Sequence, residues 1–178
     1  MDVPYIAILI IPTVNVDKSG VLITAGLVSS DPKDVTMAFN RGAGGAVEGQ
    51  IAETYLLKSD GKNRLLSPSR ETTFISLPSA VGVKKVTTFF QQPILDEQEL
   101  DQLRTFADEL VAKLSSAKAG KKQGPFDVEL GFKDKSIWLF QVRPYVENKR
   151  VRLSAYLQSL DPEFNKKTMM DLNKKLAK

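Results

Sequence analysis

Apolar and polar residues alternate most clearly in two neighbouring segments of the chain, residues 126–132 and 137–144. A repeat of two is typical of a half-buried β-strand, and the polar residues between the segments indicate a turn. The pattern therefore predicts a β-hairpin, and a loop of three residues, 134–136, is a common length for its turn.

With that loop, Glu129 would lie opposite Gln141, and Asp127 opposite Arg143, with all four side chains on one face. Carboxylate and amide oxygens suit Mg²⁺, and a guanidinium can hold a phosphate group. The face could therefore bind a magnesium nucleotide. The alternative is an ordinary solvent-exposed face on which Asp127 and Arg143 form a surface ion pair.

Other apolar runs predict further strands and one helix. Asp96 and Glu99 can cap the start of the helix, after which apolar residues recur at helical spacing from Leu100 to Leu114, and Gly120 is placed near its end. The expected fold class is α+β, a mostly antiparallel sheet with one main helix. The expected strands cover residues 5–16 and 20–28, which would form a first hairpin, then 34–40, 51–58, 64–66, 73–77 and 84–90.

A glycine-rich segment follows the third of these strands. Glycine tolerates left-handed backbone conformations, so the N–H groups of Gly42, Ala43, Gly44 and Gly45 could point into one concavity and bind a phosphate. The segment matches neither the Walker pattern nor the dinucleotide-binding pattern. A tight or flexible turn is the alternative interpretation.

Four segments together resemble the nucleotide-binding domain of phosphoenolpyruvate synthase and pyruvate phosphate dikinase. Residues 127–129 and 141–144, Asp-Val-Glu and Gln-Val-Arg-Pro, are similar to the family's Asp-Ile-Glu and Gln-Ala-Arg-Pro. Residues 19–24 and 42–44 resemble its Ser-Gly-Val-x-Phe-Thr strand and Gly-Leu-Gly loop, in the same order. The chain departs from the family at Gly45, where Glu is common. Glu48 could substitute for that acid.

The resemblance covers about residues 5–147 and implies the second half of an ATP-grasp-like domain. It implies that Glu129 and Gln141 bind Mg²⁺ and that Arg143 is a catalytic residue that contacts the ATP phosphates. In the family, phosphate passes from ATP to a histidine on a second domain and then to pyruvate on a third. We therefore expect a fragment of such an enzyme, inactive alone. The alternative is a non-catalytic module that keeps the fold and binds a nucleotide or a partner.

Two residue types are missing, and both absences restrict the chemistry. The 178 residues include no Cys and no His, which excludes a disulfide, a thiol nucleophile, a Ser-His-Asp triad and a phosphohistidine on this chain. No apolar run approaches the roughly 20 residues needed to cross a bilayer, so no membrane contact and a cytoplasmic location are expected.

Basic residues concentrate at the C-terminus. Residues 149–178 hold eight Lys or Arg against three Asp or Glu, so this segment has a net charge of +5 and residues 1–148 have −1. Only two aromatic residues accompany this charge, which disfavours nucleic-acid binding. The expected organisation is a nucleotide-binding portion over 1–148 and a basic helical appendage over 149–178, with helices near 151–160 and 165–177.

Overall fold

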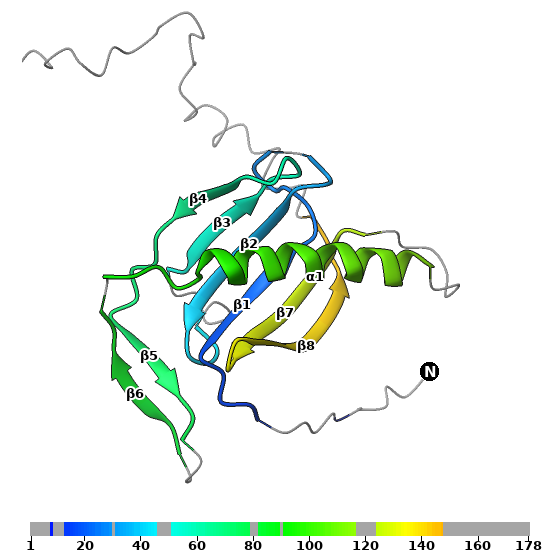
Figure 1. Cartoon of the computed structure of the whole chain (residues 1–178). Coiled ribbons are helices and arrows are strands. Elements are labelled where there is room, and N and C mark those ends of the chain that lie inside the picture. The colour runs from blue at the N-terminus through cyan, green and yellow to red at the C-terminus, as the bar shows by residue number, and fades with distance from the viewer. Residues whose placement is uncertain are drawn as a thin grey trace, which may run out of the picture. The chain divides into compact units, whose positions relative to one another are not determined.

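The computed structural model describes residues 8, 13–29, 31–45, 51–78, 82–89, 91–116 and 124–147, and its elements are shown in Figure 1. Over these described residues the fold is α+β, with a mostly antiparallel sheet and one helix, as the sequence predicted. The elements are β1 (Lys18–Ile23), β2 (Val35–Arg41), β3 (Glu53–Leu57), β4 (Asn63–Ser67), β5 (Thr73–Ser76), β6 (Lys84–Thr87), α1 (Glu97–Ser116), β7 (Phe126–Lys133) and β8 (Ser136–Pro144).

By its contacts the chain divides into two units, Met1–Tyr145 and Val146–Lys178, and every element above belongs to the first. The predicted helices at 151–160 and 165–177, like Gly120, lie outside the described residues. In the part of the chain that the structure describes, no helix is both long and apolar enough to cross a membrane.

Six strands form one antiparallel sheet in the order β4-β3-β2-β1-β7-β8, and β5 and β6 form a separate two-stranded arm (Figure 1). β1 is therefore a central strand whose two edges are occupied by β2 and β7. The predicted hairpin between 5–16 and 20–28 is wrong at its turn, because residues 18–20 are part of β1. Residues 5–7 and 9–12 lie outside the described part.

The core lies between α1 and one face of the six-stranded sheet, which the helix crosses (Figure 1). Alternate residues of the central strands point toward the helix, as the burial of Val128 and Leu130 in β7 shows. On α1, Leu100 and Leu103 are fully buried, whereas Leu114 is 37% exposed. The predicted apolar face is thus buried along the first half of the helix and partly exposed near its end.

The predicted helix cap is confirmed. The backbone N–H of Glu99 donates to the Asp96 carboxylate at 2.8 Å, and the backbone N–H of Asp96 donates to the Glu99 carboxylate at 2.8 Å. This is a reciprocal capping box, which satisfies two N–H groups that a helix start leaves without partners. Glu99 also forms an ion pair with Lys18 of β1, so the same side chain fastens the helix start to the sheet.

The β7–β8 hairpin turns through two residues instead of the predicted three. Asp134 and Lys135 have φ angles of +50° and +60°, which are typical of the tight turn that matches the twist of paired strands. Lys133 therefore pairs with Ser136. The pairing then shifts by one residue in the middle of the hairpin, where Phe140 is an extra residue on β8 that forms a β-bulge.

Candidate functional site

The four polar residues predicted to share a face do so. Beyond the bulge, Glu129 pairs with Gln141 and Asp127 with Arg143, so both predicted pairs are confirmed. Val128, between the two acids, is buried toward α1, and the alternation of a strand sends its neighbours to the other face. The helix of the described chain therefore does not cover this polar group.

Arg143 joins the two carboxylates of β7. Its Nε donates to Asp127 Oδ2 at 2.9 Å, and its Nη2 lies 3.8 Å from Glu129 Oε1. The hydrogen bond and charge of Asp127, and less strongly the charge of Glu129, raise the pKa of Arg143 above its ordinary value. The arginine side chain is 53% exposed. Ion pairs at such exposure are weak, so this arrangement adds little to stability.

An apolar strip borders the polar group on the same face. Val21 and Ile23 of β1 pair with Glu129 and Asp127, and residues directly opposite each other in a sheet project to the same side. Both apolar residues are half-buried. The polar group of β7 and β8 thus continues into an apolar surface on β1.

Glu129 and Gln141 carry the kind of ligand atom that Mg²⁺ prefers. They offer two hard oxygen donors from directly opposed positions, and Mg²⁺ usually takes one or two protein ligands and completes its shell with phosphate and water. Within the described ranges, no three Asp or Glu side chains come close enough to form a metal site by themselves. The two residues could hold a magnesium ion that arrives with phosphate groups.

The glycine-rich segment has a different environment. The N–H groups of Gly42, Ala43 and Gly44 donate to Asp17 O at 2.8 Å, Ile75 O at 3.0 Å and Ser19 Oγ at 3.0 Å, respectively. In this conformation these three groups are not available to a phosphate. Glu48 lies outside the described residues.

The segment is also distant from Arg143. It follows β2 at the end where Lys18 pairs with Arg41, whereas Arg143 lies at the level of Ile23. Five residues of strand separate these levels, which corresponds to about 16 Å. The structure therefore brings Glu129, Gln141 and Arg143 together and places the glycine-rich segment elsewhere. One phosphate group could not contact both Arg143 and the glycine-rich segment.

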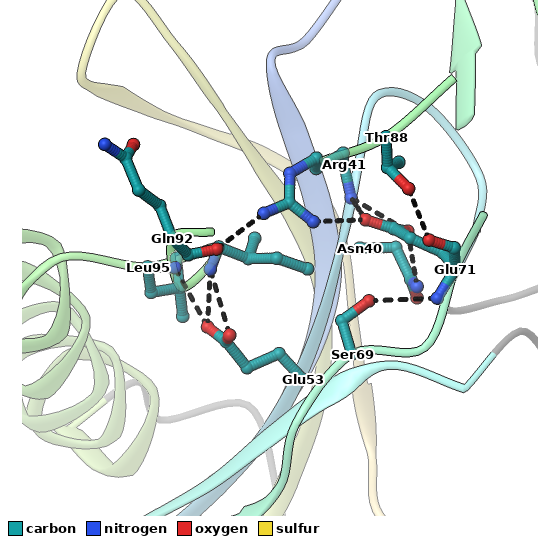
Figure 2. A network of polar contacts seen from close by, with 9 residues as sticks. Asn40, Arg41, Glu53, Ser69, Glu71, Thr88, Gln92 and Leu95 are labelled. Carbon is teal, nitrogen blue, oxygen red and sulfur yellow. Dashed lines mark hydrogen bonds and ion pairs between the residues drawn. The ribbon is translucent and has the colours of Figure 1, made fainter. Parts of the chain in front are cut away.

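A polar network that the sequence did not indicate lies at the base of the β5–β6 arm (Figure 2). The buried Glu71 carboxylate accepts hydrogen bonds from Asn40 Nδ2 at 2.8 Å and from Arg41 Nη1 at 3.0 Å. Arg41 Nη2 also donates to the backbone carbonyl of Gln92 at 2.8 Å. Glu71 sits in an irregular segment without hydrophobic periodicity, so no local pattern predicts this long-range role.

A pocket of about 640 Å³ lies beside this network, with Lys18, Arg41, Phe74 and Phe89 among its lining residues. Its two cations are already engaged, Lys18 with Glu99 and Arg41 with Glu71. Their charges are therefore used within the protein, where they fasten the helix start and the base of the arm. The polar group on β7 and β8 is the better candidate site.

A comparison of the chain with protein-family models finds no match. A comparison with curated proteins likewise finds none.

Proposed function

We propose that this chain binds Mg-ATP as a fragment of an ATP-dependent phosphotransferase that resembles phosphoenolpyruvate synthase. In this proposal a phosphoryl group of ATP passes to a histidine on another domain and then to pyruvate, so that ATP, pyruvate and water give phosphoenolpyruvate, AMP and phosphate. The support is the motif resemblance together with one structural observation: Glu129 lies directly opposite Gln141, and the Arg143 guanidinium lies on the same face, 3.8 Å from the Glu129 carboxylate.

Each of these side chains has a distinct chemical role in the proposal. Glu129 and Gln141 hold the magnesium ion that accompanies the nucleotide, which neutralises phosphate charge. Arg143 keeps its positive charge at every pH near neutrality and presents a planar fork of donors to the phosphate oxygens. Catalysis of this kind depends on positioning and charge neutralisation, not on covalent chemistry by the protein.

The chain has no histidine, so the phosphate acceptor in this proposal belongs to another domain. The polar group and its apolar border lie on one face of the sheet and would form only one wall of a nucleotide site. We therefore expect the chain alone to bind Mg-ATP weakly and to show no turnover.

Calorimetric titration of the full chain with Mg-ATP tests the site. Glu129→Ala and Arg143→Ala should each weaken binding severalfold, because each removes a direct ligand of the metal or the phosphates. Arg64→Ala is the matched control, since Arg64 is an exposed arginine on β4, at the opposite edge of the same sheet. Equal affinities for the parent chain and the two site variants would falsify the assignment.

A second candidate function is a module that binds a nucleotide or a partner without catalysis. Two observations favour it: Gly45 stands where the resembled family commonly has an acid, and the neighbouring N–H groups of residues 42–44 are engaged within the protein. Supplying the chain with radiolabelled ATP, a phosphohistidine domain and the first half of the nucleotide-binding domain of a phosphoenolpyruvate synthase, which provides the other wall of the site, separates the two. Label on the histidine supports the enzyme, whereas Mg-ATP binding without label supports the module.

A further inference from the structure

The ion pair between Arg143 and the two acids of β7 has an uneven geometry. Arg143 Nε makes a hydrogen bond of 2.9 Å with Asp127, whereas Nη2 lies 3.8 Å from Glu129, beyond hydrogen-bond distance. Asp127 thus anchors the guanidinium through one nitrogen. The contact between Arg143 and Glu129 is an ion pair without a hydrogen bond.

We propose that Arg143 is an internal counter-ion for Glu129 and that it competes with a free divalent cation for this carboxylate. This inference rests on the proposed function of the same face. A phosphate that binds Nη2 would draw the guanidinium away from Glu129 and free that carboxylate for the metal. Triphosphate and metal therefore favour each other's binding, and the free cation alone binds poorly.

The hydrogen bond to Asp127 allows Arg143 to exchange Glu129 for a phosphate as its partner. Because Nε carries the hydrogen bond to Asp127, the guanidinium can turn its outer nitrogens toward a phosphate without breaking that bond. The Arg143 side chain is 53% exposed and the Glu129 side chain 27% exposed, so both can be reached from solvent. Asp127 is accordingly a positioning residue in this proposal.

The exposure of the pair also limits the size of the effect. Exposed ion pairs are weak, so the competition should change the affinity of a free cation by about three- to fivefold. A larger change would require a buried pair, which this is not.

Binding of Mn²⁺ in the absence of nucleotide, measured by electron paramagnetic resonance, tests the proposal. Arg143→Gln should bind Mn²⁺ about three- to fivefold more tightly than the parent chain, because Glu129 loses its internal partner. Arg64→Gln removes an equal charge at the far edge of the sheet and should change the affinity little. In a Glu129→Gln background, the gain from Arg143→Gln should disappear.

Three results would overturn the inference: no tighter Mn²⁺ binding in Arg143→Gln, including no measurable binding at all; an equal gain in Arg64→Gln; or a gain that persists without the Glu129 carboxylate. Circular dichroism of each variant establishes that it is folded. The Mg-ATP titration of the parent chain is a separate measurement. A chain that shows the Mn²⁺ gain but binds no ATP would contradict the proposed function and leave the counter-ion role standing.

Discussion

Glu129 lies directly opposite Gln141 even though the turn between β7 and β8 is one residue shorter than the sequence predicted. The bulge at Phe140 is the reason, since its extra residue restores the register that the shorter turn would have changed. With the short turn and no bulge, Glu129 would lie opposite Phe140. The polar pair therefore depends on an irregularity of β8.

A second carboxylate at position 141 should make the hairpin sensitive to divalent cations. Gln141→Glu places two negative charges opposite each other, which should cost up to about 1 kcal/mol of folding free energy without metal. Mg²⁺ should then raise the melting temperature of this variant more than that of the parent, because the ion neutralises both acids. Thermal unfolding with and without Mg²⁺ measures this difference. Gln91→Glu, on an exposed loop, is the control, and a Mg²⁺ response in Gln141→Glu no larger than the parent's would contradict the prediction.

The parts of the fold that the sequence predicted depend on local signals. The capping box needs residues only three positions apart, Asp96 and Glu99, and the alternation along β7 is readable within eight residues. The polar face of the hairpin was predictable because it too follows from the alternation of neighbouring residues. The turn length was not, because two non-glycine residues, Asp134 and Lys135, adopt the positive φ angles that a two-residue turn requires.

The parts that the sequence did not predict depend on contacts between distant residues. A hairpin turn was expected between residues 16 and 20, but Lys18 and Ser19 belong to β1, whose central place is set by its pairing with β2 and β7. Partners of the Gly42–Gly44 N–H groups come from Asp17, Ser19 and Ile75, none of which can be identified from the glycine pattern itself. The role of Glu71 likewise arises only when the β5–β6 arm meets the end of β2.

Replacing Gly20 by Ala should destabilise the protein. A Cβ atom at this position would lie 2.4 Å from the carbonyl oxygen of Ala38 and 2.6 Å from the ring of Phe39, which belong to the neighbouring strand and the core. We expect a loss of about 1–3 kcal/mol in the free energy of unfolding, since overpacking forces backbone shifts. Urea unfolding of Gly20→Ala measures the loss, with Ser136→Ala at the exposed start of β8 as a control. Parent-like stability would show that β1 and β2 can separate at no cost.

The buried carboxylate of Glu53 should be needed for the segment before α1. It is 4% exposed and accepts hydrogen bonds from the backbone N–H groups of Ile94 at 2.9 Å and Leu95 at 3.0 Å. Glu53→Ala leaves these buried donors without a partner, which should cost about 1–3 kcal/mol in unfolding free energy. Glu53→Gln retains one acceptor oxygen and should cost less.

The control for Glu53 is Glu97→Ala, which removes an exposed carboxylate that accepts a hydrogen bond from Asn63 at 3.0 Å. Its effect on the unfolding free energy should be well below that of Glu53→Ala, because water replaces the lost bond. Equal losses in the two alanine variants would mean that the bonds to Ile94 and Leu95 contribute nothing beyond an exposed contact.

Stability at low pH should depend on Asp60 in the turn between β3 and β4. Hydrogen bonds from Lys62, and less strongly from Lys58, lower the pKa of Asp60 from 3.8 to about 2. Because the folded pKa lies below the unfolded one, the carboxylate stabilises the native state fully above about pH 4, and this contribution is lost as the pH falls toward about 2.

Titration of the Asp60 carboxyl by nuclear magnetic resonance should therefore show a pKa of about 2 in the parent chain. Lys62→Ala should raise that pKa toward 3.8, because it removes the side-chain hydrogen bond that lowers the pKa most. Asp60→Asn should reduce the decline in unfolding free energy between pH 4 and pH 2, since the variant has no carboxyl to protonate at this position. A pKa near 3.8 in the parent chain would mean that the Lys62 contact is not maintained in solution, and the pH dependence would then have to come from other carboxylates.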